Sequence, residues 1–418
     1  MATFRMGSKA FFLLLSLALV SNVALGVGGR GVVRGRGGGR GRKQSGPPAT
    51  IFNVMNYGAK NNGKMDSTQA FMKAWVAACH WRGNARLVVP LGTFLTGQVT
   101  FQGPCNSLNP IVVQVRGTIK AQTDISEYPS PEWFSFEEIN GLVLTGGGTF
   151  DGQGPSVWPY NDCKKNKDCQ MLPTSLKFSK VTNANVRRIN SVNSMAFHIG
   201  INRCQDFGLQ TLKITAPAES PNTDGIHISS STNIRVARSF IGTGDDCVSL
   251  GQGTYNVSIT DVICGPGHGI SIGSLGKYNM EKDVSGITVR NCTLKDTDNG
   301  VRIKTYQGSD PSKASKFIFD NIIMNNVKYP IIIDQLYCDK GCHKSPSRVH
   351  ISDVQFSNIR GTSKSDVAVS IICSPQFPCQ NVVLHDINLK LAGNKPATAE
   401  CENVKINYGG VQFPPKCM

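Results

Sequence analysis

Short triplets of apolar, variable and apolar residues recur along the second half of the chain, separated by Gly, Asn, Asp and Ser. They are Phe197-His198-Ile199, Ile226-His227-Ile228, Val248-Ser249-Leu250, Ile270-Ser271-Ile272, Val301-Arg302-Ile303, Ile331-Ile332-Ile333 and Val369-Ser370-Ile371. A second series of short apolar runs lies between them and opens at Asn185-Val186, Asn233-Ile234, Asn256-Val257, Gly286-Ile287, Lys316-Phe317, Arg348-Val349 and Asn381-Val382. A period of about 20 to 40 residues with two or three short strands is typical of a parallel β-solenoid, whose coils bury apolar side chains by stacking.

The pattern therefore predicts an all-β fold, a parallel β-helix. A β-sandwich would need hairpins every 8 to 12 residues or so, and a propeller would need a regular period of roughly 40 to 50. Only one segment has a helical period. It follows Asp66-Ser67-Thr68-Gln69, which has the form of an N-cap with its capping-box partner, and its apolar positions are Phe71, Ala74, Trp75, Ala78 and Cys79. We expect a short helix that caps the N-terminal end of the coils.

The N-terminal region divides into two further segments. Residues 1–26 have a basic start, an apolar run from Ala10 to Val20 and small residues before position 27, which is typical of a secretory signal peptide. That run is shorter than the roughly 20 apolar residues of a membrane-spanning helix. Residues 27–48 are rich in Gly and Arg without an acid, so we expect a disordered basic arm. Residues 49–418 are expected to form a single β-helix domain.

The charge balance points to an acidic partner. The 44 Lys and Arg residues exceed the 28 Asp and Glu residues, giving a formal net charge of +16. Such a balance suits a polyanion. Because a signal peptide directs the chain out of the cell, we expect no nucleic-acid partner, and no membrane partner once the signal is removed.

The cysteines indicate disulfide bonds. All fourteen lie beyond the expected signal peptide, and an even number in an exported chain favours disulfides. No pair has the C-x-x-C spacing of a zinc site and no His cluster follows, which favours short disulfide loops over a zinc site. Proximity in the sequence predicts Cys163–Cys169, Cys247–Cys264, Cys338–Cys342, Cys373–Cys379 and Cys401–Cys417.

Aligning the coils on their triplets places candidate chemistry in one column. The residues two before a triplet are Asp224, Asp246, His268 and Asn299. Stacked coils lie about 4.8 Å apart, so these carboxylates and the imidazole should form a column on one face. Like charges stacked so closely repel each other, and crowding of this kind separates the pKa values of carboxyl groups as acid/base catalysis requires. The column therefore predicts an acid/base site for glycoside hydrolysis.

Asp245 directly precedes Asp246, and neighbours in a regular strand point to opposite faces. Either Asp245 lies at a bend after Gly244 with both carboxylates outward, or one of the two is a structural acid bonded to backbone amides. Two coils further on, Arg302 and Lys304 flank an inward-pointing apolar residue and so share the outward face. Cations there could hold a substrate carboxylate.

The motifs NTDGIH (222–227), GDDC (244–247), GHGISIGS (267–274) and RIK (302–304), in this order, resemble the four motifs of the polygalacturonases of glycoside hydrolase family 28. The resemblance extends from NYGAK (56–60) to DQLYC (334–338). It implies a right-handed parallel β-helix that hydrolyses α-1,4 bonds between galacturonic acid units with inversion. It also implies a monomer without a cofactor or a metal.

Carried over motif by motif, the resemblance assigns roles to residues of this chain. Asp245 would be the general acid, and Asp224 and Asp246 would activate the water. His268 would tune the acid or contact the substrate. The residues implied to bind substrate are Arg302, Lys304, Tyr337 and Asn222.

The amino-acid sequence as a whole, including PNTDGIHIS, most resembles those of plant pollen exopolygalacturonases. This implies a secreted cell-wall enzyme that releases galacturonic acid from the non-reducing end of pectin. An endo-acting enzyme and a non-catalytic pectin-binding wall protein are the alternatives. Asn256 and Asn291 begin N-x-S/T sequons and are candidate glycosylation sites in an exported protein.

Overall fold

A computed structural model describes residues 48–107, 109–162, 166, 169–339, 345–393 and 395–417. The expected signal peptide (1–26) and the basic arm (27–48), except for its last residue, lie outside the described residues. No helix in the described part of the chain is long and apolar enough to span a membrane.

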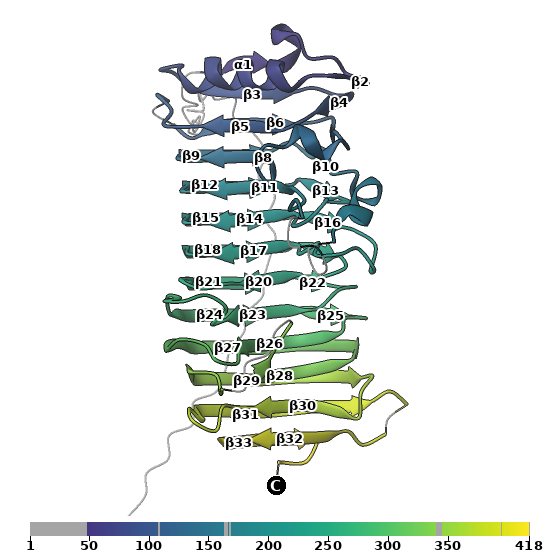
Figure 1. Ribbon diagram of the computed structural model, residues 1–418, viewed down its shortest axis with the longest axis vertical. Coiled ribbons are helices and arrows are strands. Elements are labelled where there is room, and N and C mark those ends of the chain that lie inside the picture. The colour runs from purple at the N-terminus through teal and green to yellow at the C-terminus, as the bar shows by residue number, and fades with distance from the viewer. Residues whose placement is uncertain are drawn as a thin grey trace, which may run out of the picture. The chain divides into compact units, whose positions relative to one another are not determined.

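The described chain from Pro48 onward is a stack of parallel coils, as predicted. The strands of the described residues pair in parallel, and consecutive coils lie one above the other along the stack (Figure 1). One sheet, here called the front sheet, carries the candidate site. Its strands are β5 (Val99–Gln102), β8 (Glu132–Glu137), β11 (Thr174–Ser179), β14 (Ile199–Asn202), β17 (Ile226–Ser229), β20 (Val248–Leu250), β23 (Ile270–Leu275), β26 (Asn299–Tyr306), β28 (Tyr329–Tyr337), β30 (Val367–Ile372) and β32 (Thr398–Glu402).

The remaining strands pair, coil on coil, in a larger sheet that closes each turn of the β-helix. They are β1 (Thr50–Asn53), β2 (Asn62–Asp66), β3 (Ala85–Val89), β4 (Thr93–Thr96), β6 (Ile111–Val115), β7 (Thr118–Ala121), β9 (Asn140–Thr145), β10 (Thr149–Asp151), β12 (Thr182–Arg187), β13 (Asn190–Val192), β15 (Gln205–Gln210), β16 (Lys213–Thr215), β18 (Thr232–Ala237), β19 (Phe240–Gly242), β21 (Tyr255–Thr260), β22 (Ile263–Cys264), β24 (Val284–Arg290), β25 (Thr293–Lys295), β27 (Ser312–Val327), β29 (Val349–Ser363), β31 (Cys379–Leu391) and β33 (Val404–Phe413). Short 3₁₀ helices occupy Val54–Tyr57, Ile125–Glu127, Gly154–Ser156 and Trp158–Tyr160.

The register of the front sheet confirms the triplet alignment for six of the seven coils. Ile226 pairs with Val248, which pairs with Ile270, and the series continues to Val369. The first triplet was placed wrongly, because Ile199 rather than Phe197 pairs with Ile226. Ile199-Gly200-Ile201 has the same apolar spacing, and Gly200 has no side chain that would have marked it as the outward position.

The second series was also misaligned in two coils. The predicted apolar positions were Val186 of Asn185-Val186, two residues after the aligned Ala184, and Val349 of Arg348-Val349, five residues before the aligned Val354. Through β15, Ala184 aligns with Ile234, and Val354 aligns with Phe317. The residue before each of these positions turns the corner with a positive φ, 54° at Asn183 and 55° at Asp353. Asn and Asp tolerate this left-handed conformation better than most residues, which explains their recurrence at the corners.

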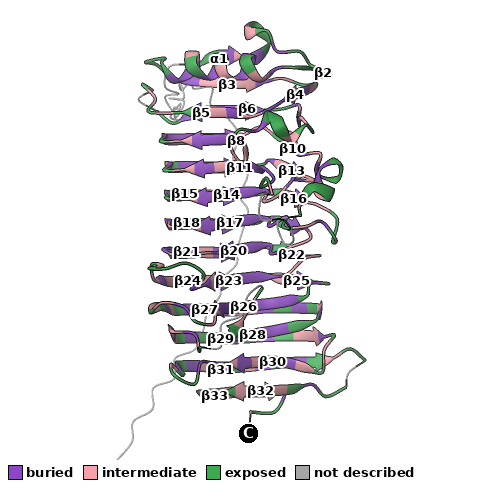
Figure 2. Cartoon of the chain, in the orientation of Figure 1, coloured by how far each residue is buried: buried purple, intermediate pink, exposed green. Residues whose placement is uncertain are grey.

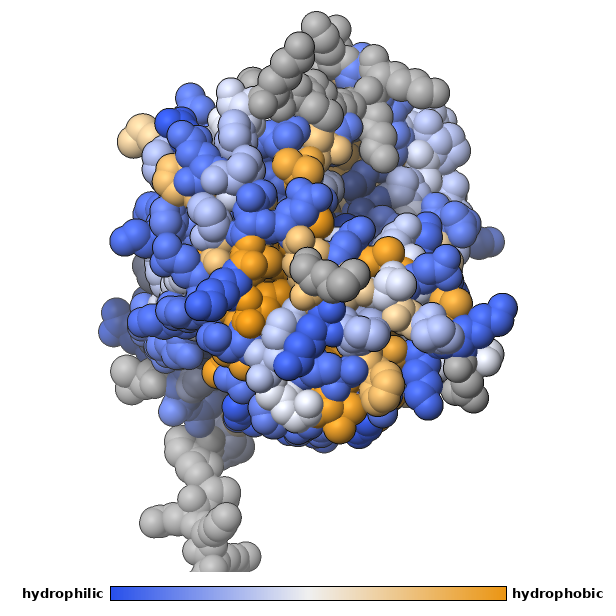
Figure 3. Space-filling view, turned by 90° about the horizontal axis from the view of Figure 1, so that it is seen from below, coloured by the Kyte–Doolittle hydropathy of each residue, from blue (hydrophilic) through white to orange (hydrophobic). Residues whose placement is uncertain are grey.

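The core lies inside the coils and is continuous from the first to the last (Figure 2). Successive coils place like residues above each other, so aromatic side chains stack. Phe136 lies 4.8 Å from Phe178 and Phe319 lies 5.0 Å from Phe356, between ring centroids and with nearly parallel planes. Seen from the C-terminal end, apolar and polar side chains intermingle on the last coil (Figure 3).

The predicted N-terminal helix is confirmed as α1 (Thr68–Cys79), and all five predicted apolar positions are buried. Its capping box is not formed as predicted. Ser67 is the N-cap residue, and its hydroxyl accepts a hydrogen bond from the Lys60 amide instead of capping the helix. Asp66 accepts a 3.0 Å hydrogen bond from the amide of Thr68. The sequence places Asp66 one residue too far from the first turn to act as its N-cap.

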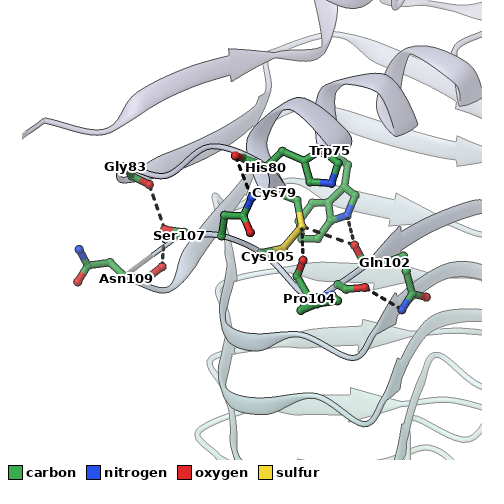
Figure 4. The surroundings of a disulfide bond; sticks show 11 residues. Trp75, Cys79, His80, Gly83, Gln102, Pro104, Cys105, Ser107 and Asn109 are labelled. Carbon is green, nitrogen blue, oxygen red and sulfur yellow. Dashed lines mark hydrogen bonds between the residues drawn. A yellow bond between two sulfur atoms is a disulfide. The ribbon is translucent and has the colours of Figure 1, made fainter.

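One face of α1 closes the first coils (Figure 4). The Trp75 indole stacks on Phe101 at 4.6 Å, and its Nε1 donates a 2.9 Å hydrogen bond to the carbonyl of Gln102. A disulfide joins Cys79, at the end of the helix, to Cys105. Proximity in the sequence did not predict this bond, because 26 residues separate the two cysteines.

Three of the predicted disulfides are confirmed, namely Cys247–Cys264, Cys373–Cys379 and Cys401–Cys417. Cys169 and Cys338 are also disulfide-bonded, whereas their predicted partners Cys163 and Cys342 lie outside the described residues. Cys204 and Cys292 are buried free thiols.

Trp75 is expected to anchor the cap. Replacing it with Ala should lower the free energy of unfolding by about 3 to 5 kcal/mol, because the change removes a buried indole. Trp75→Phe should cost about 1 to 3 kcal/mol, because the Gln102 carbonyl then loses its partner. Urea unfolding of the oxidised protein measures both. Trp81, 45% exposed, is the control, and an equal loss for Trp81→Ala would contradict the assignment.

Candidate active site

The turns that enter the front sheet bring the predicted acids together. Asp224 precedes β17, Asp246 precedes β20 and His268 precedes β23. The backbone hydrogen bonds that join neighbouring coils already begin at these residues, before the strands start. The amide of Gly225 donates to the carbonyl of Asp246 (2.9 Å), and the amide of His268 donates to the carbonyl of Asp245 (2.8 Å). The predicted column is therefore present, with the acids on successive coils.

Asp246 is buried, and its carboxylate is surrounded by donors. Arg302 Nη2 lies 3.0 Å from Oδ1, and Lys304 Nζ lies 3.1 Å from Oδ2. The hydroxyl of Ser271 donates a 2.7 Å hydrogen bond to Oδ1. A carboxylate is costly to bury unless it is paired and hydrogen-bonded. The two cations, which were predicted to bind substrate, thus also hold Asp246.

Asp245 lies at a bend, which is the first of the two alternatives left open for the neighbouring acids. Its Oδ1 lies 3.0 Å from Nδ1 of His268 and also accepts a 2.8 Å hydrogen bond from the amide of Asp246. Burial acts to raise the pKa of Asp245, but the hydrogen bond and charge of His268 outweigh it, so the pKa lies below 3.8. The same contact raises the pKa of His268 above 6.5, against the opposing effect of burial.

Asp224 is buried and makes no ion pair with any described residue. Its Oδ2 accepts a 2.7 Å hydrogen bond from Ser249, whose hydroxyl is also 2.8 Å from Nδ1 of His227. Burial raises the pKa of Asp224 well above 3.8, and the charges of Asp245 and Asp246 raise it further. The site therefore contains carboxyls whose pKa values are displaced in opposite directions, as acid/base chemistry requires.

The open part of the site is a groove at the turn side of the column. Asp245 and His268 lie in its wall, and Asp298, 64% exposed, approaches Nε2 of His268 at 3.7 Å. Asn222, also predicted, is exposed in this wall, 3.5 Å from the side-chain amide of Asn161. The residues around the groove are Asn161, Ala218, Glu219, Ser220, Pro221, Asn222, Gly244, Asp245, Pro266, Gly267, His268, Asp296 and Asp298.

The predicted Tyr337 lies on the other side of the acids. Lys304 Nζ is 5.3 Å above its ring, and the ring of Tyr306 meets it edge-on at 5.2 Å. Burial and the nearby Tyr306 raise the pKa of Tyr337 to about 12. Tyr337 therefore keeps its proton and can serve as a hydrogen-bond donor to a sugar.

Several residues of the site were not predicted. Ser249 and Ser271 are the middle residues of their triplets, so the alignment itself could have placed them beside the acids. Asn161 and Tyr306 left no such signal, because they reach the site from an irregular segment and from the end of a long strand.

The donors of the site fit a metal ion poorly. Oxygen and nitrogen atoms of Asp245, Asp246 and His268 lie within 4.8 Å of one another, which is close enough for a shared ion. Both oxygens of Asp246, however, already contact a cation, Arg302 or Lys304. A divalent ion would be repelled by these charges.

The two sequon asparagines lie at exposed corners of the coils with positive φ. The side-chain amide of Asn256 donates a 2.7 Å hydrogen bond to Asn233, and Asn291 accepts one from Asn321 at 2.9 Å. Both belong to amide ladders between coils. Glycosylation at either position stays a prediction.

A parallel β-helix with crowded, hydrogen-bonded carboxyls in a groove defines a glycoside hydrolase of the polysaccharide-cleaving type. The family model "Glycosyl hydrolases family 28" matches residues 79–411. The chain belongs to this family. The predicted kinship with polygalacturonases is confirmed.

Similar proteins come from several plants. The chain is 48% identical to the exopolygalacturonase clone GBGE184 of Arabidopsis thaliana over 391 residues, covering 91% of each chain. It is 47% identical to an exopolygalacturonase of Platanus acerifolia, covering 90% of this chain and 99% of that protein. A Zea mays exopolygalacturonase is 45% identical, with 88% and 90% covered.

Solved structures confirm the fold. The exopolygalacturonase of Thermotoga maritima superposes with a TM-score of 0.71 at 20% identity, covering 86% of this chain and 92% of that one. An endo-xylogalacturonan hydrolase of Aspergillus tubingensis gives the same TM-score at 21% identity, covering 87% and 100%. Because an exo- and an endo-acting enzyme fit equally well, the fold does not distinguish the two modes of action.

The contact between His268 and Asp245 should make stability depend on pH. The folded pKa of His268 is raised, so its contribution is complete below pH 6.5 and is lost as the pH rises through the folded value. The folded pKa of Asp245 is lowered, so its contribution is complete above pH 3.8 and is lost as the pH falls through the folded value. The pair thus contributes most between pH 3.8 and 6.5.

Thermal midpoints of the wild type and His268→Gln from pH 3 to 9 measure this contribution. The difference should be largest inside that window and shrink on both sides. Asp298→Asn is the control. The exposed carboxylate of Asp298 lies 3.7 Å from Nε2 of His268, beyond hydrogen-bond distance, so the pH profile of this variant should follow the wild type. A pH-independent difference for His268→Gln would contradict the pairing.

Proposed function

We propose that this protein is a secreted polygalacturonase that cleaves α-1,4 bonds of homogalacturonan with inversion, releasing galacturonic acid from the non-reducing end. The observation that carries the proposal is the position of Asp245. It faces the groove, bonded to His268 of the next coil, with Asp246 beside it on the same coil and Asp224 on the preceding coil. The site thus combines a proton donor with two carboxyls that could share one water.

Asp245 is the proposed general acid, although the contact with His268 lowers its pKa and so favours the carboxylate. One proton is shared between His268 Nδ1 and Asp245 Oδ1 across 3.0 Å. A sugar that covers the groove removes water, and in a less polar environment the neutral acid and neutral imidazole become more favourable than the ion pair. Binding of substrate would therefore move the proton to Asp245, which can pass it to the glycosidic oxygen.

Asp224 and Asp246 are the proposed bases. Arg302 and Lys304 hold the carboxylate of Asp246, and Ser249 orients that of Asp224. The separation of acid and base does not by itself assign inversion, because atoms of Asp245 and Asp246 lie within 4.8 Å, less than the roughly 6.5 to 9.5 Å of inverting enzymes. Inversion rests on the resemblance to the family and on the water being placed between Asp224 and Asp246.

Exo action is supported by the plant relatives named exopolygalacturonases and by one feature of the groove. After β10, the described residues up to Asn161 extend from their own coil to the site, where Asn161 contacts Asn222. A wall at this point would limit how much of a polymer passes the acids. An endo-acting enzyme would leave the groove open along the stack.

The remaining parts of the proposal concern the whole protein. Residues 1–26 would direct secretion, 27–48 would be a basic arm that adheres to acidic wall polymers, and 49–418 would form the catalytic domain. The enzyme would act as a monomer without a cofactor, in the cell wall and in pollen. The disulfides are consistent with an extracellular location.

The catalytic role of Asp245 predicts a selective loss in Asp245→Asn. Because the amide cannot donate the proton that the leaving oxygen needs, kcat on polygalacturonate should fall by about 10² to 10⁴. Retention on a polygalacturonate column should stay close to the wild type, since Arg302 and Lys304 are unchanged. Wild-type kcat in this variant would overturn the assignment, and a wild type that binds polygalacturonate without cleaving it would identify a pectin-binding protein.

Exo action predicts the product pattern. Incubation with polygalacturonate should release galacturonic acid while viscosity falls slowly, because each cleavage removes one terminal unit. Chromatography of products and viscometry on the same samples measure both. A rapid viscosity fall with mixed oligomers would make the enzyme endo-acting. Proton NMR of the first products should show the β-anomer, as inversion of an α-linkage requires, and an initial α-anomer would exclude inversion.

A further inference from the structure

A lysine on the N-terminal side of the acids has no assigned role. Lys177 lies on β11 of the front sheet, with its neighbours Leu176 and Phe178 buried in the core. It pairs with Gly200, which pairs with His227 on β17. The same row continues through Ser249 and Ser271 to Arg302. Lys177 therefore belongs to the row of outward side chains that binds the catalytic acids.

The side chain of Lys177 extends along this row toward the acids. A Cβ atom added to Gly200 would lie 3.1 Å from Cδ of Lys177 and 3.9 Å from its Cε. The aliphatic chain thus lies over the glycine of the next coil and carries the ammonium toward β17. After burial, the charge of Lys177 is the largest cause that lowers the pKa of His227, to about 4. The ammonium is therefore electrostatically close to His227, the neighbour of Ser249.

Lys177 differs from the two other cations near the acids in having no partner among the described residues. In the part of the chain that the structure describes, its ammonium makes neither an ion pair nor a hydrogen bond, although the residue is only partly exposed. Arg302 and Lys304, by contrast, are both bound to Asp246. A partly buried ammonium without a counter-charge loses hydration without compensation, and a ligand carboxylate would restore it.

We propose that Lys177 binds the carboxylate of a galacturonate unit on the β11 side of the acids, opposite the side held by Arg302 and Lys304. β11 and β26 are five coil steps apart, roughly 24 Å at about 4.8 Å a step. The acids lie between them, in the turns before β17 and β20. The groove would thus bind carboxylates on both sides of the bond to be cleaved. This inference rests on the proposed polygalacturonase function.

Lys177 acts in this scheme as a specificity-determining residue, remote from proton transfer. Lys177→Met keeps the aliphatic chain over Gly200 and removes the charge. Its KM for polygalacturonate should rise about tenfold, the effect expected for losing a charge-assisted contact, while kcat stays within about threefold. Lys177→Arg should recover most of the loss. Lys213→Met, an exposed lysine on β16 of the other sheet, removes the same charge and should leave KM unchanged.

A second substrate tests whether the carboxylate is the group that Lys177 recognises. On polygalacturonate whose carboxyls are largely methyl-esterified, the ratio of KM between Lys177→Met and the wild type should fall toward one, because the neutral ester gives the ammonium no charge to bind. A ratio that stays near ten on both substrates would indicate a structural role and overturn the proposal.

Binding measured without turnover separates affinity from chemistry. In the Asp245→Asn background, isothermal titration with a galacturonate oligomer should show about tenfold weaker binding when Lys177→Met is added. Unchanged affinity, together with wild-type KM in the single variant, would refute a role for Lys177 while leaving the hydrolase intact. If the wild type cleaves no polygalacturonate, the proposed function fails first, and the two failures are thus distinguishable.

Discussion

The structure depends on the parallel pairing of successive coils. Each coil repeats the backbone of the one before it about 4.8 Å away, so residues at equivalent positions must lie above each other. In the interior this constraint stacks apolar and aromatic side chains, such as Phe136 on Phe178. On the outside it gathers the acids of two coils and the histidine of a third into one column. The crowding that would destabilise an ordinary surface is, at this site, the source of the displaced pKa values.

Charge balance explains how the crowded acids are tolerated. Asp246 is neutralised by Arg302 and Lys304, and Asp245 by His268. Among the described residues no cation contacts Asp224 directly, and of these three acids it is the one whose pKa is raised well above its ordinary value, by burial and by its two acidic neighbours. In two of the three carboxyls, Asp245 and Asp246, cationic partners stabilise the ionised form. The third, Asp224, holds its proton more strongly. Two of these partners come from β26, so the acids depend on a coil later in the chain.

The sequence was sufficient for the fold and for the column, because both follow from the period of the apolar residues. It was insufficient where the period is ambiguous. Ile199-Gly200-Ile201 and Phe197-His198-Ile199 fit equally well by apolar spacing, and only the pairing with Ile226 decides between them. The partners of Asp246 were predicted as substrate-binding cations, since their distance from the carboxylate depends on how side chains cross from coil to coil. For the same reason Cys79 and Cys105, which meet through the packing of α1, could not be paired from spacing.

The mistaken triplet also concealed the position of Lys177. With Phe197 taken as the first member, His198 takes the outward position that Gly200 has in the structure. In the observed register Gly200 belongs to the row, and its missing side chain leaves the space over which Lys177 extends. The front sheet then carries cations on both sides of the acids: Lys177, which has no partner among the described residues, and Arg302 with Lys304, which are bound to Asp246. A polymer with a carboxylate on every unit is the ligand whose charge pattern matches such a row, because its units can meet both cationic ends while the bond between them lies over Asp245.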